Sequence, residues 1–284
     1  MTAYWRSSVS RVESDSVFIR GYDLEQLIGG QSFTASCFLL IRGRLPTPGE
    51  ARALDAVLNA VLDYALLKPG TVAARYAVSA NPSMVAGIAT AVMSVGKHTL
   101  APEDTGRFII AAHARYEASA QSLAEVAAEI ASEARSRKER IPGFGHPRFK
   151  RVDPRAQRLK QIAIAEGVWG ERAQLYELVH QAFIEAVAKP DIPINDVGMM
   201  AAVLLELGFT PEEMTGLAVL STLPGVIAHI SEELLSGTPI RVVPDELVEY
   251  DGGPPRDLEA DLAGAGWATR LDSSRCDGTE QEHT

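Results

Sequence analysis

One short run of the chain, residues 141–155, gathers side chains that can bind anions and transfer protons. Gly143 and Gly145 allow a tight backbone turn, and His146 follows them directly. Four cations come next, namely Arg148, Lys150, Arg151 and Arg155. Cations and unpaired backbone N–H groups bind carboxylates and phosphates through charge-assisted hydrogen bonds. The run therefore indicates a site for a small anion, and the alternative is a basic surface turn before a helix capped at Asp153.

The order of these residues resembles the signature loop of the citrate synthase family, which includes the citryl-CoA lyases. Gly-Phe-Gly-His is followed by Lys150, four positions after the histidine, and by Asp-Pro-Arg, which ends at Arg155. A second match lies far upstream, where Arg20-Gly21-Tyr22-Asp23 leads to Gly43-Arg44-Leu45-Pro46. The resemblance covers roughly residues 15–245, and the length of the chain is nearer to the compact citryl-CoA lyases than to full citrate synthases.

The resemblance implies a role for each part of this signature loop (residues 141–155). His146 would polarise the carbonyl or hydroxyl of the oxaloacetate half of the substrate, and Arg155 would bind a substrate carboxylate. Lys150 would face the phosphates of coenzyme A. We assign three further loop residues to the coenzyme A site, namely Gly143, Gly145 and Arg148.

Making or breaking a carbon–carbon bond beside a thioester needs three groups at one point. A base takes the α-proton, one donor stabilises the enolate, and a second donor polarises the partner carbonyl. In the family these groups are an aspartate, a histidine in a His-Gly-Gly-Ala turn, and the histidine of the signature loop. A carboxylate acts as a base near neutral pH only if burial raises its pKa.

The histidine that stabilises the enolate in the family is displaced in this chain. The resemblance places it where Thr99 stands, and the two glycines where Leu100 and Ala101 stand. His98 lies one residue early and is our catalytic candidate; the alternative is a polar residue at a helix end. Leu100 and Ala101 should narrow or reshape the pocket, because side chains replace glycines there. His113 is a weaker candidate.

The aspartate is displaced in the same way. The family reads Asn-Val-Asp-Gly before an apolar helix, whereas this chain reads Asn195-Asp196-Val197-Gly198. An ungapped match puts Val197 at the position of the base. Asp196 either caps the helix, because adjacent helical residues point about 100° apart, or is returned to the site by a local bulge. We list Asp196 as the catalytic candidate and Asn195 as a substrate-binding candidate.

The resemblance implies a further substrate-binding arginine, which is missing in this chain. Thr222 stands at its position in the segment 221–229, so citryl-CoA, which has two free carboxylates, should fit poorly. Arg241 is our match for the late arginine that reaches a neighbouring subunit's site. His229 lies on an apolar helix and is expected to belong to the core.

Composition excludes several other classes of protein. Apolar residues at 46% and charged residues at 23% describe a globular chain, and the net charge of −10 argues against a nucleic-acid surface. The two cysteines, Cys37 and Cys276, suit a reducing cytoplasm without disulfides. The start of the chain lacks a secretory signal, and we find no uncharged apolar run of about 18 residues, so no membrane span is expected.

No metal or nucleotide motif stands out. The six histidines are scattered and lack nearby cysteines or carboxylates in a ligand pattern, so we expect no metal. Neither a dinucleotide-binding glycine motif nor a phosphate-binding Walker loop is present. The chemistry implied by the resemblance needs only coenzyme A, as the thioester substrate.

Apolar spacing predicts a mainly α-helical fold of about ten helices, with a small strand or hairpin in residues 1–20. We interpret residues 68–70, Lys-Pro-Gly, as a break between helices. The alanine-rich run 83–95 is apolar on all sides, so we expect it to be central or at a subunit interface. Helix starts are expected at Ser32, Thr47, Pro154, Glu171 and Thr210.

The resemblance also implies a domain arrangement. Residues 1–99 and 213–250 would form a large helical domain, and residues 100–212 a small one that closes over the ligand in a homodimer. Residues 251–284 would be an acidic tail.

These patterns support one leading hypothesis and two rivals. The leading one is a cytoplasmic acyl-CoA enzyme resembling the citryl-CoA lyases, a lyase or transferase for a substrate with fewer carboxylates than citrate. The first rival is a homologue without catalysis that binds a CoA thioester or a protein partner. The second is an acyl-CoA thioesterase, in which a displaced carboxylate activates water.

Overall fold

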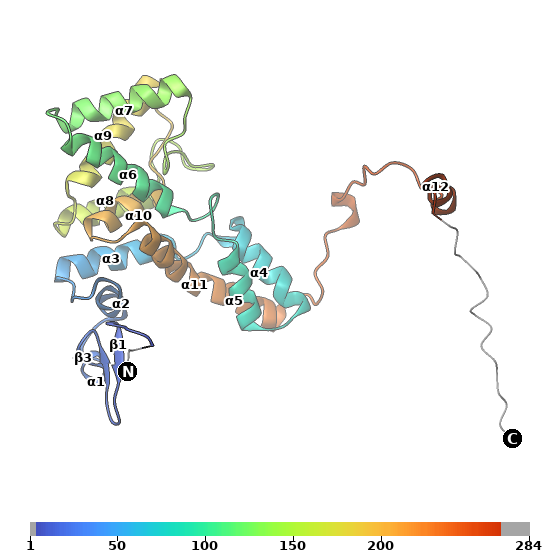
Figure 1. Ribbon diagram of the computed structural model, residues 1–284, viewed down its shortest axis with the longest axis horizontal. Helices are drawn as coiled ribbons and strands as arrows, with labels where there is room; N and C mark the ends of the chain where they lie inside the picture. Colours follow the sequence, from blue (N-terminus) through green and yellow to red (C-terminus); the bar gives the residue numbers. More distant parts are fainter. Residues whose placement is uncertain (1–3, 268–284) are drawn as a thin grey trace. The chain divides into compact units, whose positions relative to one another are not determined.

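The computed structural model describes residues 4–267 and is mainly α-helical, as the sequence predicts (Figure 1). The chain divides into two compact units, residues 1–241 and 242–284. The first unit contains helices α1 to α11 and the candidate site residues. The second contains the 3₁₀ turn η2 (Asp245–Leu247) and the short helix α12 (Leu258–Gly264). Cys276 lies outside the described residues, and Cys37 is a buried free thiol.

The predicted hairpin near the amino terminus is confirmed. Strands β1 (Ser10–Val12), β2 (Val17–Ile19) and β3 (Tyr22–Asp23) form an antiparallel sheet in the order β1-β2-β3. Helix α1 (Leu24–Leu27) follows at once, because the Asp23 carboxylate accepts from the Glu25 N–H and caps it. These elements lead into the first long helix.

The main core surrounds one buried helix, α10 (Asp196–Glu206), which contacts helices on several sides. Almost all of its residues are buried, and Met200 and Leu204 lie at the centre of the core with Phe38 and Leu54. The helices packed around it include α2 (Phe33–Arg42), α3 (Pro48–Ala60) and α8 (Pro154–Ala165). Burying such large apolar side chains stabilises the fold by roughly 1.5–3 kcal/mol each. This core fixes the start of α10, which carries Asp196.

The predicted helix starts are confirmed by their caps. The hydroxyls of Ser32, Thr47 and Thr210 each accept from a backbone N–H in the first turn, and Thr47 and Thr210 form full capping boxes. Pro154 is the first residue of α8, and Glu171 the first of α9. Because caps depend on local sequence, these boundaries could be predicted.

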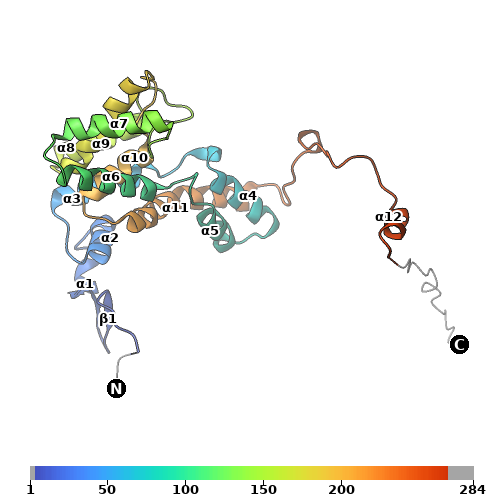
Figure 2. The same ribbon diagram turned by 45° about the horizontal axis from the view of Figure 1, so that its top comes forward.

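A second cluster lies beside the main core (Figure 2). It packs the apolar faces of α7 and α9 around Val126, Leu175 and Val179. Its helices are α6 (Pro102–Glu117), α7 (Leu123–Arg137) and α9 (Glu171–Ala186). The signature loop connects α7 to α8 and passes between this cluster and α10.

Residues 68–70 lie at a boundary between helices, as expected, although the preceding helix α3 already ends at Ala60. Helix α4 (Pro69–Ala80) begins there, with Lys68 as its N-cap residue and Pro69 as its first residue. Proline suits this position because it has no N–H to leave unsatisfied and its φ is already helical. Helices α4 and α5 (Met84–Met93) lie side by side along the C-terminal half of α11 (Pro211–Ser236), as both views show.

Helix α5 is not central within the chain. Val85 and Met93 are 76% and 86% exposed, and only Gly87 and Ala91 are buried. Of the two positions that the sequence analysis left open, the central one is therefore excluded.

Helix α11 runs for 26 residues and continues through Pro224. By length and composition it could cross a membrane, with a mean hydropathy of 1.4 over an 18-residue window. One such helix is weak evidence, because core helices of globular proteins meet the same criteria, and α11 packs against α3, α4, α5 and α6. The absence of a membrane span stays a prediction, and so does the division into large and small domains.

Candidate functional site

A cavity of about 320 Å³ brings together residues that the sequence analysis selected from distant parts of the chain. Its walls come from the segment after α3, the turn before α6, the signature loop and the start of α10. We call it the site cavity. It is lined by five candidate side chains and one candidate glycine, namely His98, His146, Arg155, Asn195, Asp196 and Gly145.

The glycines of the signature loop fit it tightly against α10. Gly143 and Gly145 have φ of 81° and 89°, in the left-handed region that favours glycine. A Cβ at Gly143 would lie 2.6 Å from the Cα of Gly198, whereas one at Gly145 would meet open space. Close packing against Gly198 therefore requires glycine at position 143. At position 145 only the backbone conformation favours glycine.

The expectation of unpaired N–H groups in this turn is wrong for two residues. The Phe144 N–H donates to the Ile141 carbonyl at 3.2 Å, and the Gly145 N–H donates to the Pro193 carbonyl at 2.7 Å. These two N–H groups are therefore not free to bind an anion.

Asn195 connects the loop to the helix. Its Oδ1 accepts from the Gly198 N–H at 2.8 Å, which caps α10, and its Nδ2 donates to the Gly145 carbonyl at 2.9 Å. Both ends of the amide are therefore occupied within the protein. This arrangement favours a positioning role over the direct substrate contact that we predicted.

His146 is held as a neutral hydrogen-bond donor. Its Nδ1 accepts from the backbone N–H groups of Arg148 at 3.1 Å and Phe149 at 3.0 Å. In a neutral ring the proton must then be on Nε2. Burial lowers the pKa of His146, with Asp153 opposing this effect and Arg155 adding to it. The ring also stacks on Phe149, with centroids 4.7 Å apart.

Arg155 lies between two carboxylates. Its Nη2 is 2.7 Å from Oδ2 of Asp153, and its Nη1 is 2.7 Å from Oδ2 of Asp196. Its Nη2 is also 3.3 Å from Nε2 of His146, and because both nitrogens are donors in this tautomer the contact is not a hydrogen bond. The guanidinium packs over the rings of Tyr64 and Phe149, at 5.0 and 5.2 Å. The Asp153 side chain is fully buried, so this carboxylate permanently compensates part of the arginine charge.

Asp196 is not the helix cap, which corrects one of the two alternatives for this residue. Asn195 caps α10, and Asp196 is the first helical residue, with its carboxylate directed at Arg155. Burial raises the pKa of Asp196; Arg155 opposes this shift, and Asp153 adds to it. A nearly buried carboxylate with a raised pKa beside an imidazole is a chemically suitable base. Val197 lines the same cavity.

The carboxylates and the imidazole come close enough to raise the question of a metal. Ligand atoms of His146, Asp153 and Asp196 lie within 4.8 Å of one another. The guanidinium of Arg155 contacts both carboxylates and already supplies a positive charge there. We therefore keep the prediction of no metal at this cluster.

The turn before α6 carries His98 to the rim of the site cavity. Gly96 and Thr99 exchange two backbone hydrogen bonds, of 3.0 and 2.8 Å, and His98 is exposed between them. Leu100 follows with φ of 56°, in the left-handed region. The backbone thus has a conformation that suits glycine although the residue is leucine, which costs roughly 1–2 kcal/mol.

The other candidates lie elsewhere. Arg148 and Lys150 are exposed on the signature loop and do not line the site cavity. Arg241 pairs with Glu233, Nε to Oε1, at 2.5 Å. His113 contacts Glu171 at 2.8 Å, and Thr222 donates to the Val219 carbonyl at 3.0 Å. None of these residues reaches the site cavity within one chain.

His229 lies on α11 as expected, but it is half-buried and not a core residue, since its Nε2 contacts Oδ2 of the exposed Asp63 at 3.2 Å. The sequence analysis missed two residues of the site cavity, Tyr64 and Lys68. Burial lowers the pKa of Lys68, with Asp63 and Asp196 opposing this shift and Arg155 adding to it. The hydroxyl of Tyr64 is buried and has no hydrogen-bond partner among residues 4–267. Pro69 could have indicated the start of α4, because proline is common at the first position of a helix, but nothing in the sequence singles out the Lys68 side chain.

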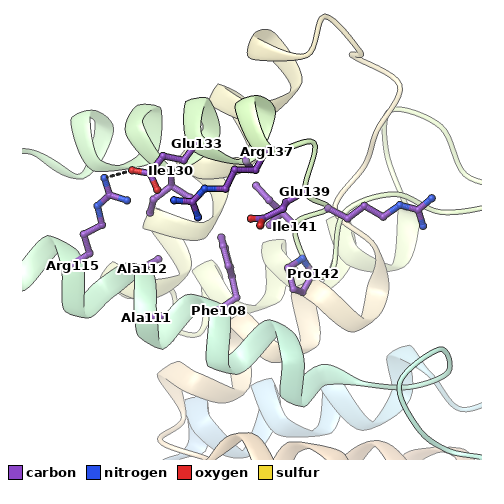
Figure 3. A pocket seen from close by; sticks show the side chains of 12 residues that line it. Phe108, Ala111, Ala112, Arg115, Ile130, Glu133, Arg137, Glu139, Ile141 and Pro142 are labelled. Atoms are coloured by element: carbon purple, nitrogen blue, oxygen red, sulfur yellow. Dashed lines mark hydrogen bonds and ion pairs between the residues drawn. The ribbon is translucent and has the colours of Figure 1, made fainter.

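A second hollow of about 440 Å³ lies between α6, α7 and the start of the signature loop (Figure 3). Its floor is apolar, with Phe108 and Ile130, and its edge carries the ion pair of Arg115 with Glu133 at 2.8 Å. None of its lining residues is a histidine or a nucleophile, so we assign it no chemistry.

The fold and the site cavity define a helical protein with a histidine, an arginine and an aspartate at one point. Residues 46–242 match the family described as citrate synthase, C-terminal domain. The chain belongs to the citrate synthase family, and its fold is of the citrate synthase type. It is 30% identical over 237 residues to citrate synthase of Mycolicibacterium smegmatis, covering 82% of this chain but 58% of that relative. The chain thus spans little more than half the length of this curated relative.

Two solved structures extend the comparison. Citryl-CoA lyase from Hydrogenobacter thermophilus has a TM-score of 0.82 and 32% identity, covering 92% of this chain and 100% of that one. ATP citrate lyase from Methanothrix soehngenii, in complex with citrate and coenzyme A, has a TM-score of 0.74 and 18% identity. That match covers 90% of this chain and 43% of the other, and its low identity shows similarity of fold alone.

Proposed function

We propose that this protein is an acyl-CoA enzyme resembling the citryl-CoA lyases, which makes or breaks a carbon–carbon bond beside a CoA thioester. The observation that carries the proposal is the shared cavity of His146 and Asp196, with Arg155 contacting both. Family membership and the similarity to citryl-CoA lyase support it. We expect a cytoplasmic protein.

In the forming direction, the Asp196 carboxylate takes the α-proton of the acyl thioester. The enolate carbon then attacks the carbonyl of the partner, which the Nε2–H of His146 polarises. The new bond forms as the carbonyl π electrons move to oxygen, and this oxygen takes the Nε2 proton of His146, which water then restores. Cleavage is the reverse: water takes the Nε2 proton of His146, the hydroxyl gives its proton to this nitrogen as the carbon–carbon bond breaks, and the enolate carbon receives a proton from the protonated form of Asp196. We assign stabilisation of the enolate to His98.

Coenzyme A would bind along the signature loop. Arg148 and Lys150 are exposed cations there, suited to phosphates, and Gly143 and Gly145 shape the loop that presents them. A further cavity of about 500 Å³, lined by Phe144, Pro147 and other loop residues, adjoins them. Arg155 would bind a substrate carboxylate by exchanging Asp196 for the ligand. Asn195 would orient the signature loop. It would contact the substrate only after the substrate carboxylate has replaced Asp196 at Arg155.

The thioester substrate would carry one free carboxylate, fewer than the two of citryl-CoA. Thr222 stands at the position of a family arginine and is neutral and outside the site cavity. Malyl-CoA and citramalyl-CoA therefore suit this site better than citryl-CoA.

We further propose that the protein is a homodimer that closes by movement of residues 100–212. The exposed apolar residues of α5, including Val85 and Met93, favour burial against a second copy. Arg241 would then reach the neighbouring subunit's site after leaving Glu233.

One rival function is favoured by a specific observation. The ion pair of Arg155 with Asp196 occupies both the carboxylate binder and the base. A protein with this pair permanently closed would bind CoA thioesters without turnover.

A coupled assay with citryl-CoA, malyl-CoA and citramalyl-CoA tests the proposal. Bond cleavage that is lost in His146→Ala and Asp196→Asn supports it. Release of the free acid without bond cleavage would indicate a thioesterase instead. Tight binding of coenzyme A without turnover of any thioester would indicate the binding protein.

A further inference from the structure

The hollow between α6, α7 and the start of the signature loop lies outside the site cavity and has no part in the function proposed above (Figure 3). Its volume of about 440 Å³ is in the range of pockets that bind small molecules. Its floor is apolar, with Phe108 from α6, Ile130 from α7 and Ile141 from the loop. Ala111 and Ala134 line it from the two helices, and their small side chains leave the space open. The hollow can therefore hold a compact apolar group.

The edge of the hollow carries charges of both signs. The guanidinium of Arg115 is compensated, because it pairs with Glu129 at 2.7 Å and with Glu133 at 2.8 Å. Arg137 and Glu139 are exposed, and neither forms an ion pair with any residue that the structure describes. Both side chains extend over the hollow in Figure 3. One cation and one anion are thus available to a ligand at the same edge.

These features indicate a ligand that carries both charges and an apolar group. A carboxylate would accept charge-assisted hydrogen bonds from Arg137, and an ammonium would donate to Glu139. In an α-amino acid one carbon atom joins these two groups, so both lie at the same end of the molecule. An apolar side chain at the other end would leave water and pack on Phe108 and Ile130, which favours binding.

A ligand in the hollow would also contact the base of the signature loop. Ile141 lines both this hollow and the cavity of about 500 Å³ beside the proposed coenzyme A site. Its carbonyl accepts from the Phe144 N–H at 3.2 Å. The carbonyl of Pro142, which also lines the hollow, accepts from the buried hydroxyl of Tyr176 at 2.9 Å. A ligand packed on these two residues would therefore restrain the turn that carries His146.

We propose that this hollow is a regulatory site for an α-amino acid with an apolar side chain, such as leucine. The carboxylate of the ligand binds Arg137, its ammonium binds Glu139, and its side chain occupies the apolar floor. No covalent bond is made or broken there. The bound ligand holds the signature loop in one position, so the site acts on the loop and not on the substrate.

Isothermal titration calorimetry with L-leucine and three analogues tests the site. L-leucinamide lacks the carboxylate, 4-methylpentanoate lacks the ammonium, and glycine lacks the side chain. The wild type should bind L-leucine about fivefold or more tightly than each analogue, because each omits one of the three contacts. Arg137→Gln should weaken binding of L-leucine but not of L-leucinamide. Glu139→Gln should weaken binding of L-leucine but not of 4-methylpentanoate.

Two further variants separate this site from general binding to the protein surface. Arg135→Gln removes an exposed arginine of α7 that does not line the hollow, and it should keep the affinity for L-leucine. Ala111→Phe fills the hollow from an exposed position of α6, so it should abolish binding without lowering the melting temperature.

The effect on the signature loop is measured by amide hydrogen exchange. L-leucine should slow exchange within residues 141–149 about twofold or more, because the loop opens less often when the hollow is filled. Binding that leaves this exchange unchanged overturns the regulatory role. Absence of L-leucine binding, equal binding of L-leucine and its analogues, or unchanged binding in Ala111→Phe overturns the site itself. None of these measurements depends on turnover of a thioester, so their results are separate from those that test the proposed function.

Discussion

Oδ2 of Asp196 lies 2.7 Å from Nη1 of Arg155, so the proposed base and the proposed carboxylate binder form an ion pair. The guanidinium of Arg155 contacts both Asp196 and the fully buried Asp153, so its positive charge reduces the repulsion between the two carboxylates. Asp196 can therefore lie close to Asp153, although burial raises its pKa. A substrate carboxylate at Arg155 would displace Asp196 and release it to act as a base. Binding and activation of the base would then be coupled through one guanidinium.

Asp196→Asn should lower kcat by about 10²–10⁴-fold, because the amide cannot take the α-proton. The variant should also change how stability depends on pH. Since burial raises the pKa of Asp196 in the folded protein, its ionised form costs folding free energy. This cost is absent below the ordinary pKa of a carboxyl and develops as the pH rises through the raised pKa. The melting temperature of the variant relative to wild type should therefore be higher at pH 7 than at pH 4; the opposite trend contradicts the assigned shift.

Leu100→Gly should stabilise the folded backbone. Leu100 has φ of 56°, where a Cβ is strained, and removing the strain offers roughly 1–2 kcal/mol. The greater freedom of glycine in the unfolded chain and the loss of the Leu100 side chain from its packing against the main core offset this gain. Leu100→Ala loses most of the same packing but keeps the strain, so we expect Leu100→Gly to be more stable than Leu100→Ala by about 0.5–1 kcal/mol. Chemical denaturation measures it, and Leu100→Ala is the control, because it shortens the side chain but keeps the Cβ. If Leu100→Ala and Leu100→Gly have the same stability, the effect comes from packing and not from backbone strain.

Gly143→Ala and Gly145→Ala form a matched pair within the signature loop. Both have positive φ, but only a Cβ at Gly143 would collide with the backbone of Gly198, at 2.6 Å. We expect a loss of about 2–4 kcal/mol for Gly143→Ala and about 1 kcal/mol for Gly145→Ala. Equal losses in denaturant titrations would show that the loop does not pack on α10 as described.

Val85→Glu on α5 should prevent dimerisation. Val85 is 76% exposed on an apolar helix face, and a buried, unpaired carboxylate at an interface costs several kcal/mol. Ile164→Glu on α8 is the control, since Ile164 is also exposed and apolar. Analytical ultracentrifugation should show monomers for the first variant and dimers for the wild type and control. A wild-type protein that sediments as a monomer contradicts the dimer.

Much of the fold followed from local sequence, because capping residues such as Thr47 and Thr210 specify helix starts by short-range hydrogen bonds. The loop residues His146 and Arg155 could be selected for the same reason, as their spacing lies in one continuous motif. Lys68 and Tyr64 could not, because their importance arises from burial and from missing partners, which depend on distant residues. Asp196 was left open between two orientations, and only the cap made by Asn195 decides between them.

The central claim is that His146 and Asp196 act on one thioester in one cavity. Its most direct test is the initial rate of citramalyl-CoA cleavage by wild type, His146→Ala and Asp196→Asn, with citryl-CoA as the comparison substrate. The account predicts cleavage of citramalyl-CoA by the wild type, slower cleavage of citryl-CoA, and a loss of about 10²-fold or more in each variant. Cleavage by either variant at the wild-type rate would contradict it.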